Sequence, residues 1–238
     1  MNRIEQLFSH MDRWRHLPAY QLERRADIFF SLYLVEVLEE VTGVPVSPSL
    51  VPEFPIKREL IGSHKSTGHS VQVDYVAFAA DRSKLYMVEL KTDIGSRRDK
   101  QDDYLRRAKE VGISALLEGL IEIVLVTKST YRQKYAHLLQ ALADHGCLSL
   151  HAELMDFIFP KGRSGLGELL RKSRVTVGPG EFDIEVIYIQ PTKEVGDDNV
   201  IDFEEFAQVV GRHEDGVSQT FADHLRRWTS KAGAARPA

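Results

Sequence analysis

Three charged residues in two otherwise apolar stretches are suited to holding a divalent cation. Asp74 lies in the run 71–79, and Glu89 and Lys91 lie in the run 84–91. A few carboxylate oxygens, completed by water, form the kind of site that Mg²⁺ prefers in proteins. An ammonium group beside such a site can orient a water molecule and neutralise charge that develops on a phosphate. The residue types therefore favour metal-assisted hydrolysis of a phosphate ester.

Whether these side chains meet depends on a predicted β-hairpin. Both runs are strand-like, and Asp81-Arg82 are the polar breakers between them, so an antiparallel hairpin centred there pairs residues whose numbers sum to 163. That register sets Asp74 opposite Glu89, and the alternation of a strand puts Lys91 on the face of Glu89. Opposed side chains have Cβ atoms about 4.5–5.5 Å apart, where like charges destabilise the pair. A bound cation would explain why both acids stand there.

The pattern Asp74, fourteen intervening residues and then Glu89-Leu90-Lys91 resembles the PD-(D/E)XK nuclease superfamily. In that family the two motif parts lie on adjacent strands of a helix–strand–strand–strand–helix–strand core. The resemblance implies that Asp74, Glu89 and the backbone carbonyl of Leu90 bind Mg²⁺ or Mn²⁺, and that Lys91 positions the attacking water. It further implies hydrolysis of DNA, and it leaves room for a homodimer, because many endonucleases of this type pair to cut both strands.

The resemblance also implies supporting residues outside the hairpin. The family often adds an acid from its first helix, and Glu36 is our choice because it is the only charge between Ile28 and Leu38, with Glu40 as the alternate. Gln101 and Tyr104 are similar to a pair on the helix after the motif in RecB-like nucleases, although their spacing is one residue shorter. The basic run that begins with Arg97 and Arg98 could follow a phosphate backbone.

The elements that must position these residues give an α/β fold with a mixed β-sheet flanked by helices. The periodicity predicts helices at 2–16 and 22–42, strands at 54–61, 71–79 and 84–91, a helix at 98–118, a strand at 121–127 and a helix at 131–144. Beyond these, it predicts strands at 149–159 and 182–190 and helices at 166–173, 203–210 and 218–230. We interpret 1–147 as a nuclease-like core with an N-terminal helix, 148–230 as an α/β extension packed on it, and 231–238 as a disordered tail.

The composition is that of an ordinary globular protein, with 43% hydrophobic and 28% charged residues. A single cysteine, Cys147, excludes an internal disulfide, and charges throughout the first fifteen residues argue against a signal peptide. No apolar run suits a membrane helix, so we expect a cytoplasmic protein with no membrane partner. The sequence has no Walker loop, nucleophile elbow or dinucleotide fingerprint.

Other interpretations stay open. The net charge of −4 argues against a dedicated nucleic-acid binder, because such domains are usually basic. The chain could therefore be a weak or inactive nuclease-fold module that acts in binding. The alternation around Asp74 is also compatible with a solvated sheet face that carries a charge cluster, and Gln101, Tyr104 and the basic run with an ordinary exposed helix.

Overall fold

The computed structural model describes residues 2–62, 70–93, 97–127, 129–154, 166–178 and 180–229, and the chain divides into two compact units. Unit 1 comprises Met1–Leu50, Val88–Arg98 and Ile187–Ala238, and unit 2 comprises Val51–Met87 and Asp99–Val186. Each unit draws on both sides of residue 147, where the sequence predicts a core to end and an extension to begin. The predicted tail at 231–238 lies outside the described residues.

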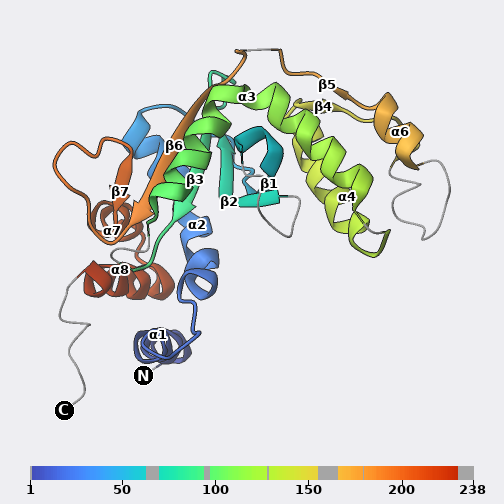
Figure 1. Ribbon diagram of the computed structural model, residues 1–238. Helices are drawn as coiled ribbons and strands as arrows, with labels where there is room; N and C mark the ends of the chain where they lie inside the picture. The colour runs from blue at the N-terminus through green and yellow to red at the C-terminus, as the bar shows by residue number, and fades with distance from the viewer. Residues whose placement is uncertain are drawn as a thin grey trace. The chain divides into compact units, whose positions relative to one another are not determined.

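A five-stranded mixed sheet in the order β1-β2-β3-β6-β7, with flanking helices, confirms the α/β class (Figure 1). Its strands are β1 (Val51–Lys57), β2 (Ser70–Phe78), β3 (Lys84–Leu90), β6 (Asp183–Gln190) and β7 (Val200–Asp202). β1 and β2 are antiparallel, whereas β6 and β7 are parallel. The amide of Asp183 donates to the Ser83 carbonyl, and the amide of Lys91 donates to the Ile189 carbonyl. Because residue numbers increase in the same direction along both strands, β3 runs parallel to β6.

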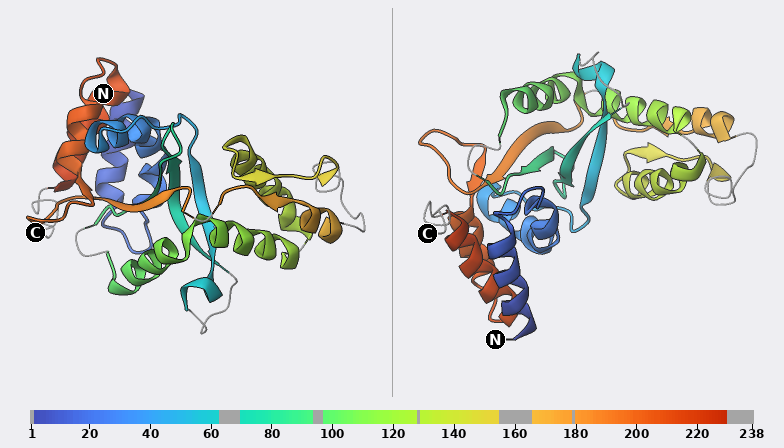
Figure 2. Two further views of the ribbon diagram at one scale, coloured as in Figure 1. Left: turned by 90° about the horizontal axis from the view of Figure 1, so that it is seen from above. Right: turned by 60° about the horizontal axis from the view of Figure 1, so that its bottom comes forward.

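Unit 1 is built mainly from four helices, α1 (Arg3–Trp14), α2 (Glu23–Thr42), α7 (Phe203–Val210) and α8 (Gly216–Thr229). The sequence predicts each of them to within two residues. α1 and α8 lie side by side (Figure 2). Capping boxes start α1 at Asn2 and α7 at Asp202, and Gly43, with φ +68°, ends α2 in the left-handed region that glycine tolerates. An aromatic core lies between the helices, formed by Phe8, Phe30, Phe203, Phe206 and Phe221.

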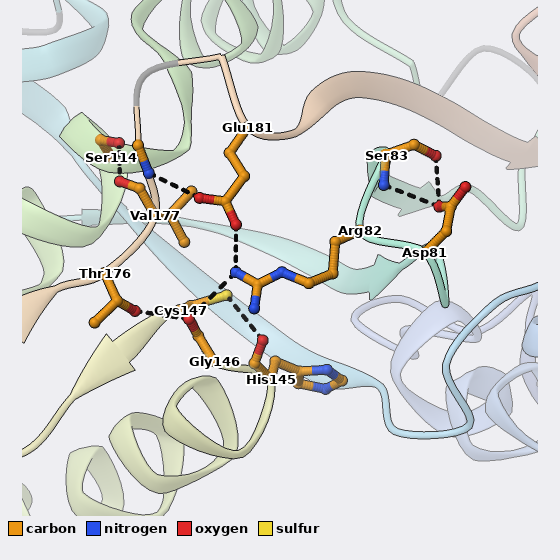
Figure 3. A network of polar contacts seen from close by, with 11 residues as sticks. Asp81, Arg82, Ser83, Ser114, His145, Gly146, Cys147, Thr176, Val177 and Glu181 are labelled. Atoms are coloured by element: carbon orange, nitrogen blue, oxygen red, sulfur yellow. Dashed lines mark hydrogen bonds and ion pairs between the residues drawn. The ribbon is translucent and has the colours of Figure 1, made fainter.

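The turn between β2 and β3 in unit 2 has the predicted centre. The amide of Ala79 donates to the Lys84 carbonyl at 2.9 Å, a pair whose numbers sum to 163. The Asp81 carboxylate accepts from the amide and hydroxyl of Ser83, and Arg82 occupies the left-handed region at φ +63°. The Arg82 guanidinium then reaches Glu181 at 2.6 Å and the Gly146 carbonyl at 3.3 Å (Figure 3). Local turn chemistry and this clamp together fix the hairpin's closed end.

The predicted strand at 121–127 is wrong, because these residues continue the helix α3 (Asp99–Val126). Its isoleucines and valines favour a strand by type, but their spacing is helical. The buried residues recur at three- and four-residue intervals, at Ile113, Leu116, Leu117, Leu120, Ile123 and Val124. α3 is interrupted only at Gly112, where φ is +78° and ψ is +164°. This helix packs against β1 in unit 2.

Two other predicted strands are also corrected. The strand expected at 54–61 begins earlier, at Val51, and its last four residues form a 3₁₀-helix, η1 (Arg58–Ile61). The strand expected at 149–159 is reduced to β4 (Leu148–Ser149). Residues 150–153 form a loop and turn, Leu154 is helical, and 155–159 lie outside the described residues. The remaining elements of unit 2 are α4 (Ser129–Asp144), α6 (Leu166–Lys172) and β5 (Arg174–Val175), which pairs with β4. No helix in the described part of the chain is both long and apolar enough to cross a membrane.

Candidate active site

Lys91 directly follows β3, and oxygen atoms of unit 1 hold its ammonium group. Nζ donates to Glu89 Oε1 at 2.8 Å and to the Leu90 carbonyl at 3.0 Å. The side chains of Glu89 and Lys91 are only 4% and 7% exposed. The Lys91 amide is itself bonded to Ile189 of β6, which fixes the backbone at this point. Two of the predicted site residues are therefore brought together as a buried ion pair at the end of a strand.

A second carboxylate stands beside this pair. Glu23, in the first turn of α2, places Oε2 3.8 Å from Lys91 Nζ. Two carboxylates and one backbone carbonyl therefore lie around the Lys91 ammonium group, and burial makes such charges costly unless they are paired. The arrangement holds one ammonium group in place, ready to donate to an anionic oxygen.

Glu23 replaces Glu36 as the acid of the first helix that lies beside Lys91. Thirteen residues separate the two glutamates on α2, which is about 20 Å of helical rise. The Glu36 carboxylate is instead hydrogen-bonded to His213, with 2.8 Å between Oε2 and Nε2. The choice of Glu36 requires its apolar neighbours in sequence to be buried, yet Ile28 and Leu32 are 61% and 63% exposed. Glu23 escapes sequence reasoning because it stands in a run of charged residues, which is typical of a solvated helix start.

The alternate, Glu40, is also committed elsewhere. Both of its oxygens accept hydrogen bonds from Arg212, at 2.9 and 3.0 Å. The Arg212 guanidinium lowers the pKa of the Glu40 carboxyl from its usual range. This surface pair joins α2 to the turn after α7, so its part in unit 1 is structural.

Three other predicted site residues belong to unit 2. Asp74 is half-buried on β2, between Val73 and Tyr75, which pair with Phe54 and Pro52 of β1. Gln101 and Tyr104 are half-buried in the first turns of α3, three residues apart and hence on neighbouring positions of one helix face. Their proposed roles stay predictions.

Arg97 and Arg98 differ in their surroundings, although they are adjacent in sequence. The Arg97 guanidinium carbon lies 3.9 Å from the centroid of the Tyr188 ring, a cation–π contact within unit 1. Arg98 is exposed. Of the two, Arg98 is therefore the residue better placed to meet a phosphate that approaches from solvent.

Cys147 does not supply a nucleophile. Its thiol is buried in unit 2, and burial raises its pKa to about 11, although the Arg82 guanidinium opposes that rise (Figure 3). At pH 8 only about one thiol in a thousand is ionised, and the thiolate is the reactive form. A disulfide reagent is therefore expected to leave the native protein unmodified over minutes at pH 8 and to label one thiol per chain at once in concentrated urea. Rapid labelling of the native protein would contradict this assignment.

A separate groove of about 520 Å³ lies in unit 2 at the Gly112 interruption of α3. Its charged lining consists of Lys109, Glu110, Glu118 and Asp183. Three acids and one lysine do not favour a phosphate ligand, and none of the predicted site residues lines it. The chemistry that the sequence predicts therefore does not belong to this groove.

Within the described ranges, no group of three or more His, Cys, Asp or Glu side chains is arranged to hold a metal ion. A Mg²⁺ site needs fewer, because this ion commonly takes one or two carboxylates and keeps several waters. Comparisons of the chain with known protein families, with curated proteins and with solved structures find no match.

Proposed function

We propose that the protein is a Mg²⁺- or Mn²⁺-dependent nuclease that hydrolyses phosphodiester bonds of DNA. The observation that carries the proposal is the buried pair of Glu89 and Lys91 at the end of β3, with the Leu90 carbonyl and the Glu23 carboxylate beside it. A buried ion pair is seldom more stabilising than apolar side chains of the same size. Its presence at a strand end therefore favours a chemical role over a structural one.

The order of elements supports the resemblance to the PD-(D/E)XK superfamily. α2 is followed by β1, β2 and β3, then by α3, and β6 runs parallel to β3. The helix–strand–strand–strand–helix–strand order is kept if α4, β4, α6 and β5 are an insertion before the last strand. The hairpin turn has the register that would set Asp74 opposite Glu89 if it continued along both strands.

The residue types of the motif suit a hard divalent cation. Asp74, Glu89 and the Leu90 carbonyl would hold it through oxygen atoms, which Mg²⁺ and Mn²⁺ prefer. When bound, the ion supplies positive charge to the phosphate and makes water more acidic.

The protein's own groups then position the reactants. Lys91 has three ammonium protons, and in this structure it donates hydrogen bonds to Glu89 and to the Leu90 carbonyl. With DNA present, one of these protons would be directed to the attacking water or to a phosphate oxygen as charge develops there. Glu23 would help to orient the Lys91 ammonium group, because its carboxylate lies 3.8 Å from Nζ. The burial of Glu89 and Lys91 strengthens these interactions by limiting their exposure to water.

Activity assays on matched variants test the proposal. Wild type, Glu89→Gln, Lys91→Met and Asp74→Asn would be incubated with supercoiled plasmid and with linear single- and double-stranded DNA in Mg²⁺, Mn²⁺ or EDTA. We expect cleavage that requires metal and falls at least about 100-fold in all three variants, the loss typical of removing one transition-state donor. Glu36→Gln is the control, because Glu36 is bonded to His213 rather than to Lys91.

The binding-module alternative rests on one specific observation. Lys91 occupies the Glu89 oxygen and the Leu90 carbonyl, two of the atoms that would otherwise take the metal. A site closed in this way on its own lysine would bind DNA or a protein partner without cutting. If the folded wild type leaves every substrate intact in Mg²⁺ and Mn²⁺, the nuclease proposal is wrong and this alternative replaces it.

A further inference from the structure

The segment that joins α1 to α2 concentrates positive charge and aromatic rings at the surface of unit 1. We call residues 13–25 the basic–aromatic linker. Arg13, Arg24 and Arg25 are exposed, and the Trp14 side chain is 43% exposed. The acids of this region are engaged elsewhere, because Asp12 bonds to His224 and Trp228 and Glu23 faces Lys91. A local excess of arginine is notable in a chain whose net charge is −4.

The rings of this region form a small open platform. Trp14 packs edge-on against His10 at 4.5 Å and against Tyr20 at 6.1 Å, and the Arg25 guanidinium lies 6.0 Å from the Tyr20 ring. Ala19, just before Tyr20, has φ +63°, a conformation that costs a non-glycine residue energy and that redirects the chain there. An edge-to-face contact covers a face of only one of the two rings, and the 43% exposure of Trp14 leaves part of its indole accessible to another partner.

The platform is attached to the chain segment that carries Lys91. Arg15 donates to the Thr92 carbonyl at 3.0 Å and to the Asp93 carboxylate at 3.1 Å. Thr92 and Asp93 directly follow Lys91. Near the other end of the linker, Glu23 places its carboxylate 3.8 Å from Lys91 Nζ. Both ends of the linker therefore border the candidate active site within unit 1.

We propose that the basic–aromatic linker binds single-stranded DNA and guides it to Lys91. Unpaired bases expose flat faces that stack on aromatic rings, and arginines bind the phosphates between them. Duplex DNA hides those faces inside its stack, so the platform favours single strands or frayed ends. This inference names the substrate form of the nuclease proposed above, and so it rests on that function.

The test measures binding separately from cleavage. Fluorescence anisotropy in EDTA would follow the full-length protein binding to a labelled oligothymidylate of about 15 nucleotides, the upper range for a single binding domain. We expect Trp14→Ala to weaken binding about tenfold, within the range for removing one ring on which a base stacks. Trp14→Phe keeps a ring and is expected to bind better than Trp14→Ala. Replacing Arg24 and Arg25 by Gln should reduce the slope of log K against log salt by roughly 0.7 for each phosphate that these arginines neutralise.

Two matched controls lie elsewhere in the same unit. Val41→Ala shortens the side chain of a residue that is 45% exposed at the other end of α2, and Arg3→Gln removes the charge of an exposed arginine at the start of α1. Neither should change binding, and all variants should melt within a few degrees of wild type. The inference is overturned if Trp14→Ala binds like wild type, if blunt duplex binds as tightly as single strands, or if wild type binds neither.

The two proposals fail in different ways. Binding that depends on Trp14, without cleavage in Mg²⁺ or Mn²⁺, would retain the platform and reject the nuclease. If cleavage depends on Glu89 but Trp14→Ala binds single-stranded DNA like wild type, the nuclease proposal stands and the proposal for the basic–aromatic linker is wrong.

Discussion

Replacing Lys91 by methionine is expected to lower the free energy of unfolding by about 3–5 kcal/mol, the usual cost of removing one partner of a buried ion pair. The methionine fills a similar volume, so the loss would come from charge rather than from a cavity. Glu89 would be left buried with its partner gone, and Glu23 nearby would add like-charge repulsion. Urea denaturation followed by circular dichroism measures the change.

The double variant Glu89→Gln/Lys91→Met isolates the role of charge. Because both charges are removed, it should recover much of the stability lost in Lys91→Met, since apolar or neutral replacement of a whole buried pair is often nearly neutral. Lys193→Met is the matched control. Lys193 forms its ion pair with Glu205 at the surface of unit 1, where the side chains are 35% and 36% exposed, and such pairs contribute about 1 kcal/mol or less. A loss in Lys91→Met no larger than in Lys193→Met would mean that the Glu89–Lys91 pair is effectively solvated.

The same measurement connects stability to the proposed cation. A ligand that binds only the folded state raises its apparent stability by mass action. We therefore expect Mg²⁺ at millimolar concentration to stabilise the wild type, and Glu89→Gln to remove that effect. Stabilisation that survives in Glu89→Gln would locate the cation elsewhere.

The parts of the site that can be predicted from sequence are those fixed by local chemistry. The hairpin is predictable because alternating residues and the Asp81-Arg82 turn both act over a few positions, and Ala79 pairs with Lys84 as expected. Glu89 and Lys91 share a face because a strand alternates. Their burial follows in part from β6, which is bonded to Lys91 through Ile189. β6 is almost a hundred residues away from Lys91 in sequence. The pattern of residues predicts that β6 is a strand, but it does not predict that β6 lies beside β3.

The prediction of a strand at 121–127 and the choice of Glu36 both rest on residue type within a helix. Glu36 is favoured because apolar residues surround it in sequence, but a helix distributes those residues over both faces, and Ile28 and Leu32 face solvent. The β-branched residues of 121–127 favour a strand, but packing of Leu116, Leu120 and Ile123 along one face overrides that preference. In both cases the residue types alone favour the wrong environment or element. The three- to four-residue spacing of the apolar positions is the helical signal.

Phe221→Ala is expected to destabilise unit 1 by about 3–5 kcal/mol, the usual range for removing a buried phenylalanine ring. Phe221, on α8, is fully buried. Its ring centroid lies 5.2 Å from that of Phe30 in a perpendicular arrangement, and aromatic pairs of this geometry add to the energy of burial. Further rings pack around it within 6.4 Å, those of Phe8, Phe29, Tyr33, Phe206 and Trp228. Truncation would therefore leave a cavity at the centre of the aromatic core.

This substitution also tests whether the candidate site depends on the end of the chain. α2 carries Glu23 to Lys91, and Phe30 of α2 packs against Phe206 of α7 and Phe221 of α8. Loosening α8 should therefore disturb α2, and we expect Phe221→Ala to lose Mg²⁺ stabilisation as well as intrinsic stability. Leu32→Ala is the control on α2, because its side chain is 63% exposed and surface changes usually stay within about 0.5 kcal/mol. If Phe221→Ala costs no more than Leu32→Ala, the C-terminal helices are not part of the core that supports the site.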